Sequence, residues 1–227
     1  MDTQSLQKIN ENFFTKELFE NIKSNFVDIN DALAVRNAIK SVLIDNPKLL
    51  ACTAESILTA AYQAIHMNLS ISPKLGYVYF IPYKKQAQLQ IGYKGMLQLA
   101  IRSGFYKHIN SDIVFEGMIK AHDFITGEYI LVEADRKSDK VEGYIAYFEL
   151  VNGFRKMLFM TADQMHWHAQ KFSAAYQYDL QNNERKSLWS TDFDSMAKKT
   201  VLNLLLKSYG ILSVDMEKVL TADFKEQ

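Results

Sequence analysis

Lys94, Gln98 and Arg102 form a row of polar side chains that could hold consecutive phosphates of a polyanion. Their spacing of i, i+4 and i+8 places them on one side of a helix. Lys94 and Arg102 lie roughly 12 Å apart along the helix axis, from the ~1.5 Å rise per residue. No acidic residue on this helix relieves their repulsion, and a polyanion would. A solvated helix face with unpaired cations is the alternative interpretation.

The charges around this row are segregated along the chain. Residues 112–150 contain nine acidic residues against four basic ones. Residues 56–111 contain no acidic residue, and their six basic ones are Lys74, Lys84, Lys85, Lys94, Arg102 and Lys107. Such segregation is expected where one surface binds phosphates and another does not. Aromatic rings near cations suit the stackable bases of single strands, and those lying among the basic residues are Tyr83, Tyr93, Phe105 and Tyr106. Core packing is the simpler role for Tyr93.

A second cationic helix face is predicted from Asp192 to about Ser208. Lys198 and Lys199 are expected on its exposed side, where they would be available for phosphate, and Lys207 at the margin of that side. The apolar face is expected to contain Phe193, Met196, Ala197, Thr200, Val201, Leu204 and Leu205. A plain solvated face is again the alternative.

Other groupings of reactive side chains are weaker. His166 and His168 are two residues apart on a predicted helix, so their rings diverge by about 200° and cannot readily share a metal ion. The sequence GYKG is too short for a phosphate-binding loop and lacks its Ser or Thr, so ATP hydrolysis is not indicated. Cys52 is the only cysteine, and we expect it to be buried and inert rather than catalytic.

Composition sets the limits for these interpretations. Lys plus Arg equals Asp plus Glu at 26 each, which excludes a globally basic nucleic-acid-binding protein and makes any electrostatic argument local. A hydrophobic content of 48% supports a substantial core. The single cysteine fits a reducing compartment. The start MDTQSLQKIN lacks the layout of a signal peptide, and no apolar run approaches the ~20 residues of a membrane span, so we expect a soluble, cytoplasmic protein.

The predicted elements begin with helices. An amphipathic helix in residues 1–30 would pack on the body or reach a neighbouring subunit. Further helices are predicted over Asp31–Ile44, up to the Asn46-Pro47 breaker, and over Thr53–Met67. Alternation in GYVYFIPY and AQLQI, around a Lys84-Lys85-Gln86 tip, predicts a β-hairpin. Helical spacing then returns over Gly92–Ser103 and ends at Gly104.

The second half of the chain reads as strands followed by helices. The strand candidates are HINSDIVFEG, FITGEYILVEA with a Thr126-Gly127 turn, EGYIAYFEL, and FRKMLFM after an Asn152-Gly153 turn. Thr161 and Gln164 form a capping box that starts a helix, and residues 173–190 are predicted to be a loop. The fold class is therefore α+β, with helices flanking an antiparallel sheet that a helix interrupts.

Two blocks of the sequence are distinctive: PKLGYVYFIPYKKQAQLQIGYKGMLQLAIRSG and MAKKTVLNLLLKSYGILSVDM. They resemble the RecT family of phage and prophage single-strand annealing recombinases. The likeness covers roughly residues 45–217. It divides the chain into an N-terminal helical arm (1–30), a DNA-binding and annealing core (31–217) and a short C-terminal tail (218–227).

The resemblance implies an α+β fold akin to that of the Redβ annealing protein, and an activity without ATP that is not enzymatic. Such a protein binds single-stranded DNA, pairs it with its complementary strand and assembles into rings or helical filaments that serve homologous recombination and DNA repair. A 5′–3′ exonuclease and the host single-strand-binding protein are the implied partners, although the acidic or polar tail linked to the latter is short here. No cofactor is implied, and the binding of Mg²⁺ is left open.

The resemblance also assigns a basic DNA-binding groove in an oligomer. Carried over to this sequence, its residues are Lys84, Lys85, Gln88, Gln90, Tyr93, Lys94, Gln98, Arg102, Lys107, Lys198, Lys199 and Lys207. Two other classes of function stay open at this point. A metal-dependent nuclease would cleave DNA in a reaction that EDTA stops, and an assembly protein with a basic interaction face would bind acidic partners but no oligonucleotide.

Overall fold

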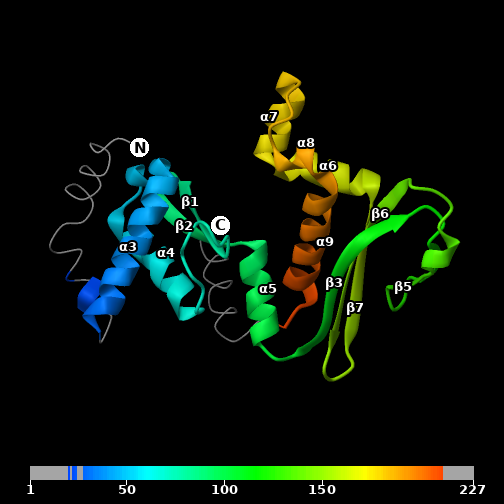
Figure 1. The fold of residues 1–227 in the computed structure, drawn as a ribbon, viewed down its shortest axis with the longest axis horizontal. Coiled ribbons are helices and arrows are strands. Elements are labelled where there is room, and N and C mark those ends of the chain that lie inside the picture. The colour runs from blue at the N-terminus through cyan, green and yellow to red at the C-terminus, as the bar shows by residue number, and fades with distance from the viewer. Residues whose placement is uncertain (1–19, 21, 25–27, 212–227) are drawn as a thin grey trace. The chain divides into compact units, whose positions relative to one another are not determined.

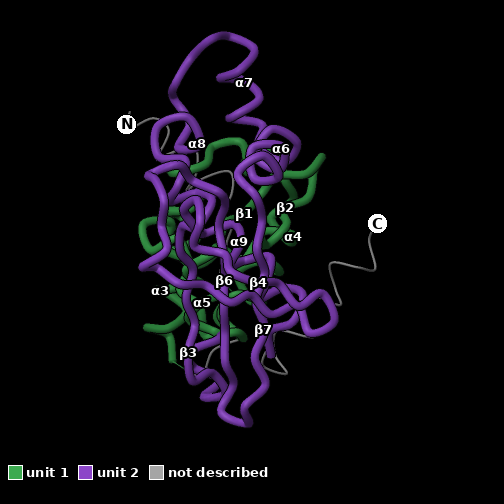
Figure 2. Tube along the Cα trace, turned by 90° about the vertical axis from the view of Figure 1, so that its right-hand side faces the viewer, with its two compact units in different colours: residues 1–99, 212–227 green, residues 100–211 purple. Residues whose placement is uncertain are grey.

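A computed structural model describes residues 20, 22–24 and 28–211 of the chain (Figure 1). These residues form two compact units, one up to Leu99 and the other from Ala100 to Ile211 (Figure 2). The predicted N-terminal arm and C-terminal tail lie almost entirely outside the described residues. Their boundaries stay a prediction.

The first unit begins with two helices that start at side-chain caps. The Asp28 carboxylate accepts a hydrogen bond from the Asn30 amide at the start of the first helix. The Thr53 hydroxyl accepts one from the Ser56 amide at the start of the second. The first helix ends just before Pro47, as the Asn-Pro breaker predicts. The elements are α3 (Ile29–Asp45), the short 3₁₀ helix η1 (Pro47–Ala51) and α4 (Ala54–His66).

The predicted β-hairpin follows these helices, as β1 (Val78–Tyr83) and β2 (Gln86–Ile91). Its two-residue turn is Lys84-Lys85. Pro82 lies next to the turn, where the sequence places it, opposite Ala87. Val78, Phe80, Ala87 and Leu89 are buried, and the hairpin packs on α4. Because side chains alternate along a strand, the other face of the hairpin is turned to solvent.

Helix α5 (Tyr93–Arg102) confirms the helix predicted after the hairpin. It ends ahead of Gly104, whose φ of +72° is the left-handed conformation that glycine adopts readily at a helix end. The boundary between the two compact units falls inside α5, after Leu99.

The second unit is built on a three-stranded antiparallel sheet in the order β3-β6-β7. Tyr144, Ala146, Phe148 and Leu150 alternate along the central strand, are buried, and face the long helix α9, which crosses all three strands. A tight Asn152-Gly153 turn joins the central strand to its neighbour, as predicted, with Gly153 at φ +85°. The elements are β3 (Tyr106–Phe115), β6 (Val141–Leu150), β7 (Arg155–Thr161) and α9 (Phe193–Tyr209).

A separate two-stranded hairpin interrupts this sheet in sequence. Its strands are β4 (Ile119–Asp123) and β5 (Glu128–Leu131), followed by the short η2 (Glu133–Asp135). The Asp123 carboxylate accepts hydrogen bonds from the Ile125 and Thr126 amides in the turn between the strands. This turn includes the predicted Thr126-Gly127 pair. These hydrogen bonds hold the pKa of Asp123 below its ordinary value.

Three shorter helices gather at the N-terminal end of α9 (Figure 1). The first begins with the predicted capping box, in which the Thr161 and Gln164 side chains each accept the other's backbone amide. The other two cover residues 174–182 and 188–191, so the prediction of a loop over 173–190 is wrong except for the short connection between them. Polar AAYQYDLQN shows little amphipathic periodicity, and its helix depends on the Ser173 cap and on tertiary contacts. The three are α6 (Ala162–Phe172), α7 (Ala174–Asn182) and α8 (Leu188–Thr191).

The α+β class with antiparallel strands is confirmed. The single interrupted sheet is not found, because the strands of the described residues form three separate sheets of two, three and two strands. The turns and alternation that the sequence displays fix each hairpin but not which hairpins share hydrogen bonds. None of the helices within residues 28–211 is long and apolar enough to cross a bilayer.

Candidate nucleic-acid interface

The solvent-facing side of the β1–β2 hairpin alternates aromatic or aliphatic side chains with amides. Cross-strand partners Tyr79 and Gln90, Ile81 and Gln88, and Tyr83 and Gln86 form three rungs on this face. Tyr79, Ile81 and Tyr83 are exposed, which is unusual for three large side chains in a row. Gln88 and Gln90 are among the predicted groove residues, whereas Tyr79 and Ile81 are not. The alternation in GYVYFIPY contained the signal, since inward Val78 and Phe80 require outward neighbours.

The hairpin tip is held in place by the N-terminus of α4. The Thr53 amide donates to the Lys85 carbonyl over 2.8 Å, and the Ala87 amide donates to the Ser56 hydroxyl over 2.9 Å. Lys84 adopts a positive φ of +52°, which a two-residue hairpin turn requires. Its ammonium lies 5.5 Å from the centre of the Tyr83 ring. Lys84 and Lys85 are therefore exposed cations at the end of the aromatic–amide face.

The start of α5 is packed against the same hairpin. A Cβ added to Gly76 would lie 3.1 Å from Tyr79 Oη and 4.0 Å from Lys94 Cδ. The Tyr79 and Lys94 side chains therefore lie close together beside Gly76. Gly92 and Gly95 are buried, and a Cβ on Gly95 would lie only 2.1 Å from the Tyr77 carbonyl oxygen. Neither glycine therefore exposes its backbone to a ligand. They allow the helix to pack closely on the chain before β1.

The row along α5 has the predicted exposure at its two ends. Lys94 and Arg102 are exposed, and Gln98 between them is half-buried. Tyr93 is also half-buried, and burial raises the pKa of its phenol. The opposite side of the helix is buried through Met96, Leu99 and Ala100.

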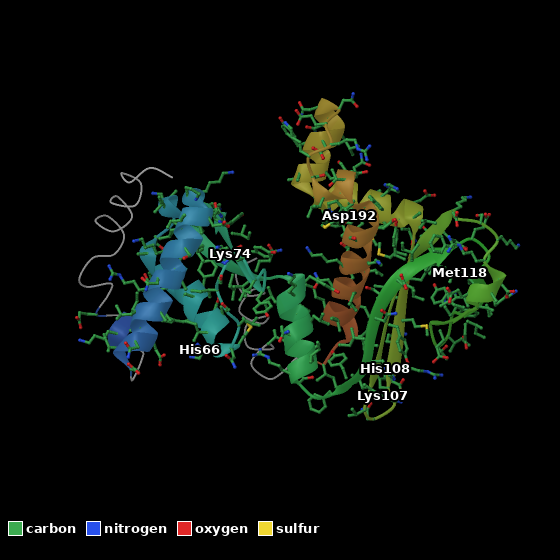
Figure 3. The ribbon with its side chains drawn as sticks, viewed as in Figure 1. His66, Lys74, Lys107, His108, Met118 and Asp192 are labelled. Atoms are coloured by element: carbon green, nitrogen blue, oxygen red, sulfur yellow. The ribbon has the colours of Figure 1, made fainter. Side chains whose placement is uncertain are left out.

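Lys107 lies at the start of β3, beside His108 (Figure 3). Its ammonium donates to Glu149 Oε1 of β6 over 2.8 Å, and this hydrogen bond raises the pKa of Lys107 and lowers that of Glu149. The pair is solvent-exposed on the lysine side, so it contributes little to stability and can be exchanged for a phosphate.

The cations of α9 are less exposed than predicted. Lys198 and Lys199 are half-buried, and only Lys207 is exposed. Lys198 Nζ lies 3.9 Å from Asp112 Oδ1 on β3. The buried stripe is rotated around the helix from the predicted one, since it contains Ala197, Val201, Leu202, Leu205 and Leu206. Phe193 misled the prediction because it packs on the rings of His166 and Trp189 in the helical cluster, not on the sheet.

The structure brings together one subset of the predicted residues. Lys84, Lys85, Gln88, Gln90, Tyr93 and Lys94 belong to the hairpin and the helix start, which pack on each other. We call this subset, together with Tyr79, Ile81 and Tyr83, the hairpin face. Within the described residues, Lys84, Lys85 and Lys94 form no ion pair. Arg102 and the lysines at 107, 198, 199 and 207 belong to the second unit, and a groove shared with them stays a prediction.

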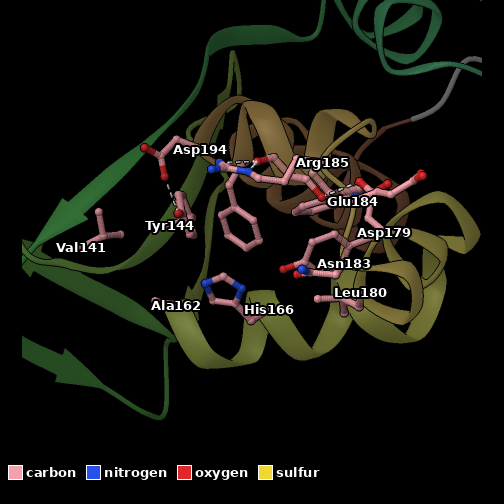
Figure 4. A pocket seen from close by; sticks show the side chains of 14 residues that line it. Val141, Tyr144, Ala162, His166, Asp179, Leu180, Asn183, Glu184, Arg185 and Asp194 are labelled. Carbon is pink, nitrogen blue, oxygen red and sulfur yellow. Dashed lines mark hydrogen bonds between the residues drawn. The ribbon is translucent and has the colours of Figure 1, made fainter.

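The second unit contains a pocket of about 630 Å³ between β6, α6 and the α7–α8 segment (Figure 4). Aromatic rings form much of its wall. Phe193 stacks on His166, with 4.0 Å between the ring centres, and also contacts Trp189 and Tyr176. The Tyr144 hydroxyl donates to Asp194 over 2.6 Å at one side. Burial, followed by this hydrogen bond, raises the pKa of Tyr144 well above its ordinary value. The aromatic contacts tie the helical cluster to the sheet.

Asp179 is a buried carboxylate that links α7 to α8 by hydrogen bonds. The side chain is 2% exposed and accepts hydrogen bonds from the Ser190 hydroxyl at 2.5 Å and from the Ser187 and Lys186 amides. These donors, with Ser190 contributing most, hold the pKa of Asp179 far below its ordinary value. A carboxylate so solvated by protein groups serves structure, not proton transfer.

An Asp179→Asn variant is expected to be less stable and less sensitive to acid. Because the folded-state pKa of Asp179 is depressed, its stabilisation is present above the ordinary pKa of about 3.9 and is lost as the pH falls below that value. Urea unfolding at pH 6 and pH 3 should show a lower midpoint at pH 6 for the variant and a smaller decrease between the two pH values. Glu142→Gln, which changes an exposed carboxylate on β6, is the control and should behave like the parent. Equal acid sensitivity of Asp179→Asn and the parent would contradict this assignment.

No group of three or more His, Cys, Asp or Glu side chains within the described residues is arranged to hold a metal ion. His166 and His168 take part in different ring contacts, with Phe193 and Phe172 respectively.

Comparison with known proteins decides the family. Residues 32–226 match the RecT family. The chain belongs to the RecT family. It is similar to Uncharacterized protein YqaK of Bacillus subtilis (strain 168), with 43% identity over 163 residues, which cover 72% of this chain and 54% of YqaK. It is also similar to Protein RecT of Escherichia coli (strain K12), with 29% identity over 189 residues, which cover 79% of this chain and 66% of that protein.

The RecT match extends beyond the two blocks that carry the resemblance in the sequence. It includes most of α3 and all of α4 ahead of the hairpin, the β4–β5 hairpin and the helical cluster before α9. The hairpin face and both cationic helices therefore lie within the RecT-family part of the chain. The aligned part spans 54% and 66% of the lengths of the two relatives.

Proposed function

We propose that this chain binds single-stranded DNA and anneals it to a complementary strand, without ATP, as an assembling DNA-recombination protein. The proposal is supported by membership of the RecT family and by the hairpin face. DNA is the ligand, held mainly through its backbone.

The hairpin face is the observation that carries the proposal. Lys84, Lys85 and Lys94 are exposed and have no carboxylate partner in the described part of the chain, so a phosphate would not have to displace one. Between them lie exposed rings of Tyr79 and Tyr83. Cations that follow a backbone, combined with aromatic rings on which bases stack, are the general means by which proteins bind single strands without selecting sequence.

Annealing requires no chemical step. Duplex formation is favourable by about 1.4 kcal/mol per base-pair step, but two bare strands repel each other and fold on themselves. A row of lysines neutralises one backbone and keeps the strand extended, while phosphate contacts leave the base edges available for pairing. Because phosphate contacts do not read base identity, we propose that binding tolerates any sequence.

One chain covers only a few nucleotides, since the α5 row spans roughly 12 Å. Testing complementarity over a longer strand then requires several chains side by side. We propose an oligomeric ring or filament in which residues 1–30 link neighbouring subunits and the second unit's Arg102, Lys107, Lys198, Lys199 and Lys207 complete the groove.

The affinity for single-stranded DNA is expected to fall with salt. Each phosphate contact releases condensed counterions and contributes a slope of about −0.7 in log K against log[salt] for a single strand. Four to five contacts per chain give a slope of roughly −3. Fluorescence anisotropy of a labelled oligonucleotide at several salt concentrations measures this slope.

The same preparation should accelerate pairing of two complementary oligonucleotides in the absence of ATP. Strand cleavage that EDTA abolishes would instead indicate a metal-dependent nuclease. Failure to bind any oligonucleotide at low salt would contradict the proposed function and favour an assembly protein.

A further inference from the structure

Helix α6 carries an exposed aromatic and cationic cluster around Trp167 in its last two turns. Met165 and Ala169 are buried, and at 100° per residue Trp167 points almost directly away from them. Trp167 is 58% exposed and Phe172 is 64% exposed. Their ring centres lie 6.4 Å apart, edge to face. Core packing therefore does not account for this tryptophan.

Lys171 adds a positive charge to these two rings. Its ammonium lies 4.5 Å from the centre of the Trp167 ring and 5.2 Å from that of Phe172. Across the described residues it forms no ion pair with a carboxylate. Asp163 is the one acidic residue of α6, and it lies in the first turn, where the helix amides balance its charge.

We infer that Trp167, Lys171 and Phe172 form a second contact for single-stranded DNA, on which one unpaired base stacks while Lys171 holds its phosphate. The inference rests on the proposed function and adds a site outside the predicted groove. The chemistry of the three side chains selects this ligand, because an exposed indole next to an unpaired ammonium matches a base joined to a phosphate. Any base can stack there, since every base has a flat face.

The two tryptophans of the chain make the site directly observable. Trp167 is exposed, whereas Trp189 is 7% exposed and sealed among rings of the helical cluster. Adding an unlabelled oligonucleotide should therefore quench the emission of Trp167, and Trp167→Phe should lose most of this quenching. A labelled oligonucleotide followed by anisotropy reports total binding in parallel.

Trp167→Ala should weaken binding of the labelled oligonucleotide about tenfold, whereas Trp167→Phe should retain most of the affinity because it keeps a stacking ring. The slope of affinity with salt should be unchanged in Trp167→Ala and shallower by about 0.7 in Lys171→Ala, because only the lysine contacts a phosphate. Phe124→Ala, which removes an 85% exposed ring from the β4–β5 turn, is the matched control and should bind normally.

The outcomes separate the inference from the function on which it rests. A full anisotropy change without Trp167 quenching, together with parent-like binding by Trp167→Ala, would overturn the α6 site and leave the proposed function standing. Altered sedimentation of DNA-free Trp167→Ala, with no quenching by DNA in the parent, would assign this surface to a second copy of the chain and also overturn the site. Absence of any binding by the parent would remove both proposals.

Discussion

A Lys94→Ala/Arg102→Ala double variant is expected to lose strand annealing while keeping its fold. Both residues are exposed on α5, and neither is part of the buried side of that helix. Two charged hydrogen bonds to phosphates, at about 1.5 kcal/mol each, correspond to a loss of about 100-fold in affinity for single-stranded DNA. The salt slope should become shallower by about 1.4, or 0.7 for each lost contact.

The matched control removes two lysines from the acidic half of the chain. Lys120 and Lys140 are exposed, and Lys120 Nζ lies 2.5 Å from Asp135 Oδ2. Lys120→Ala/Lys140→Ala lowers the net charge by the same amount, so similar losses in both double variants would indicate a general charge effect. Annealing by Lys94→Ala/Arg102→Ala at nearly the parent rate, with an unchanged melting temperature, would refute the assignment of the α5 row.

A Gly95→Ala variant is expected to destabilise the first unit by about 2 kcal/mol or more, towards the upper part of the usual range for overpacking. Helix propensity alone would favour alanine by about 1 kcal/mol. The new Cβ, however, would lie 2.1 Å from the Tyr77 carbonyl oxygen and 3.0 Å from its carbon. Both are backbone atoms, so no side-chain rotation relieves the clash, and α5 must move away from the hairpin.

Thermal unfolding followed by circular dichroism measures this effect, and DNA binding should weaken with it because Lys94 moves with the helix. Lys94→Ala, one residue away on the exposed side of α5, is the control and should melt like the parent while also binding DNA less well. A Gly95→Ala protein that is as stable as the parent would show that the close approach of α5 to Tyr77 does not hold.

The local parts of the fold could be predicted because each has a short-range physical cause. The Asn152-Gly153 turn, the Thr161–Gln164 capping box and the alternation of the β1–β2 hairpin are all confirmed. Residues 173–190 could not be predicted in this way. Asp179, whose hydrogen bonds hold α7 to α8, finds its partners up to 11 residues away, and the polar sequence around it has no helical period.

The candidate site shows the same limit. Exposure of Lys84 and Lys85 follows from their place at the hairpin tip and that of Lys94 from helical spacing, and the structure agrees. The burial of α9 depends on two partners at once, the sheet beneath it and the helical cluster at its start. A helical wheel assumes one buried direction for the whole helix. Because Phe193 faces the helical cluster and the later apolar residues face the sheet, the wheel wrongly put Lys198 on the exposed side. Tyr79 is not among the predicted groove residues, although the alternation of GYVYFIPY turns it outward once Val78 and Phe80 face the core.

Lys107 and Lys198 each have a carboxylate close to the ammonium group, that of Glu149 and that of Asp112 respectively. A phosphate that binds either lysine would displace the carboxylate, which stays nearby. The lysine therefore exchanges one anion for another, and the phosphate contact is easily reversed. Lys84 and Lys94, which have no carboxylate partner among the described residues, would hold a phosphate more tightly. The paired lysines would release it more readily, because their carboxylates can replace it. If the chain anneals DNA as proposed, such a mixture would help it to release the finished duplex.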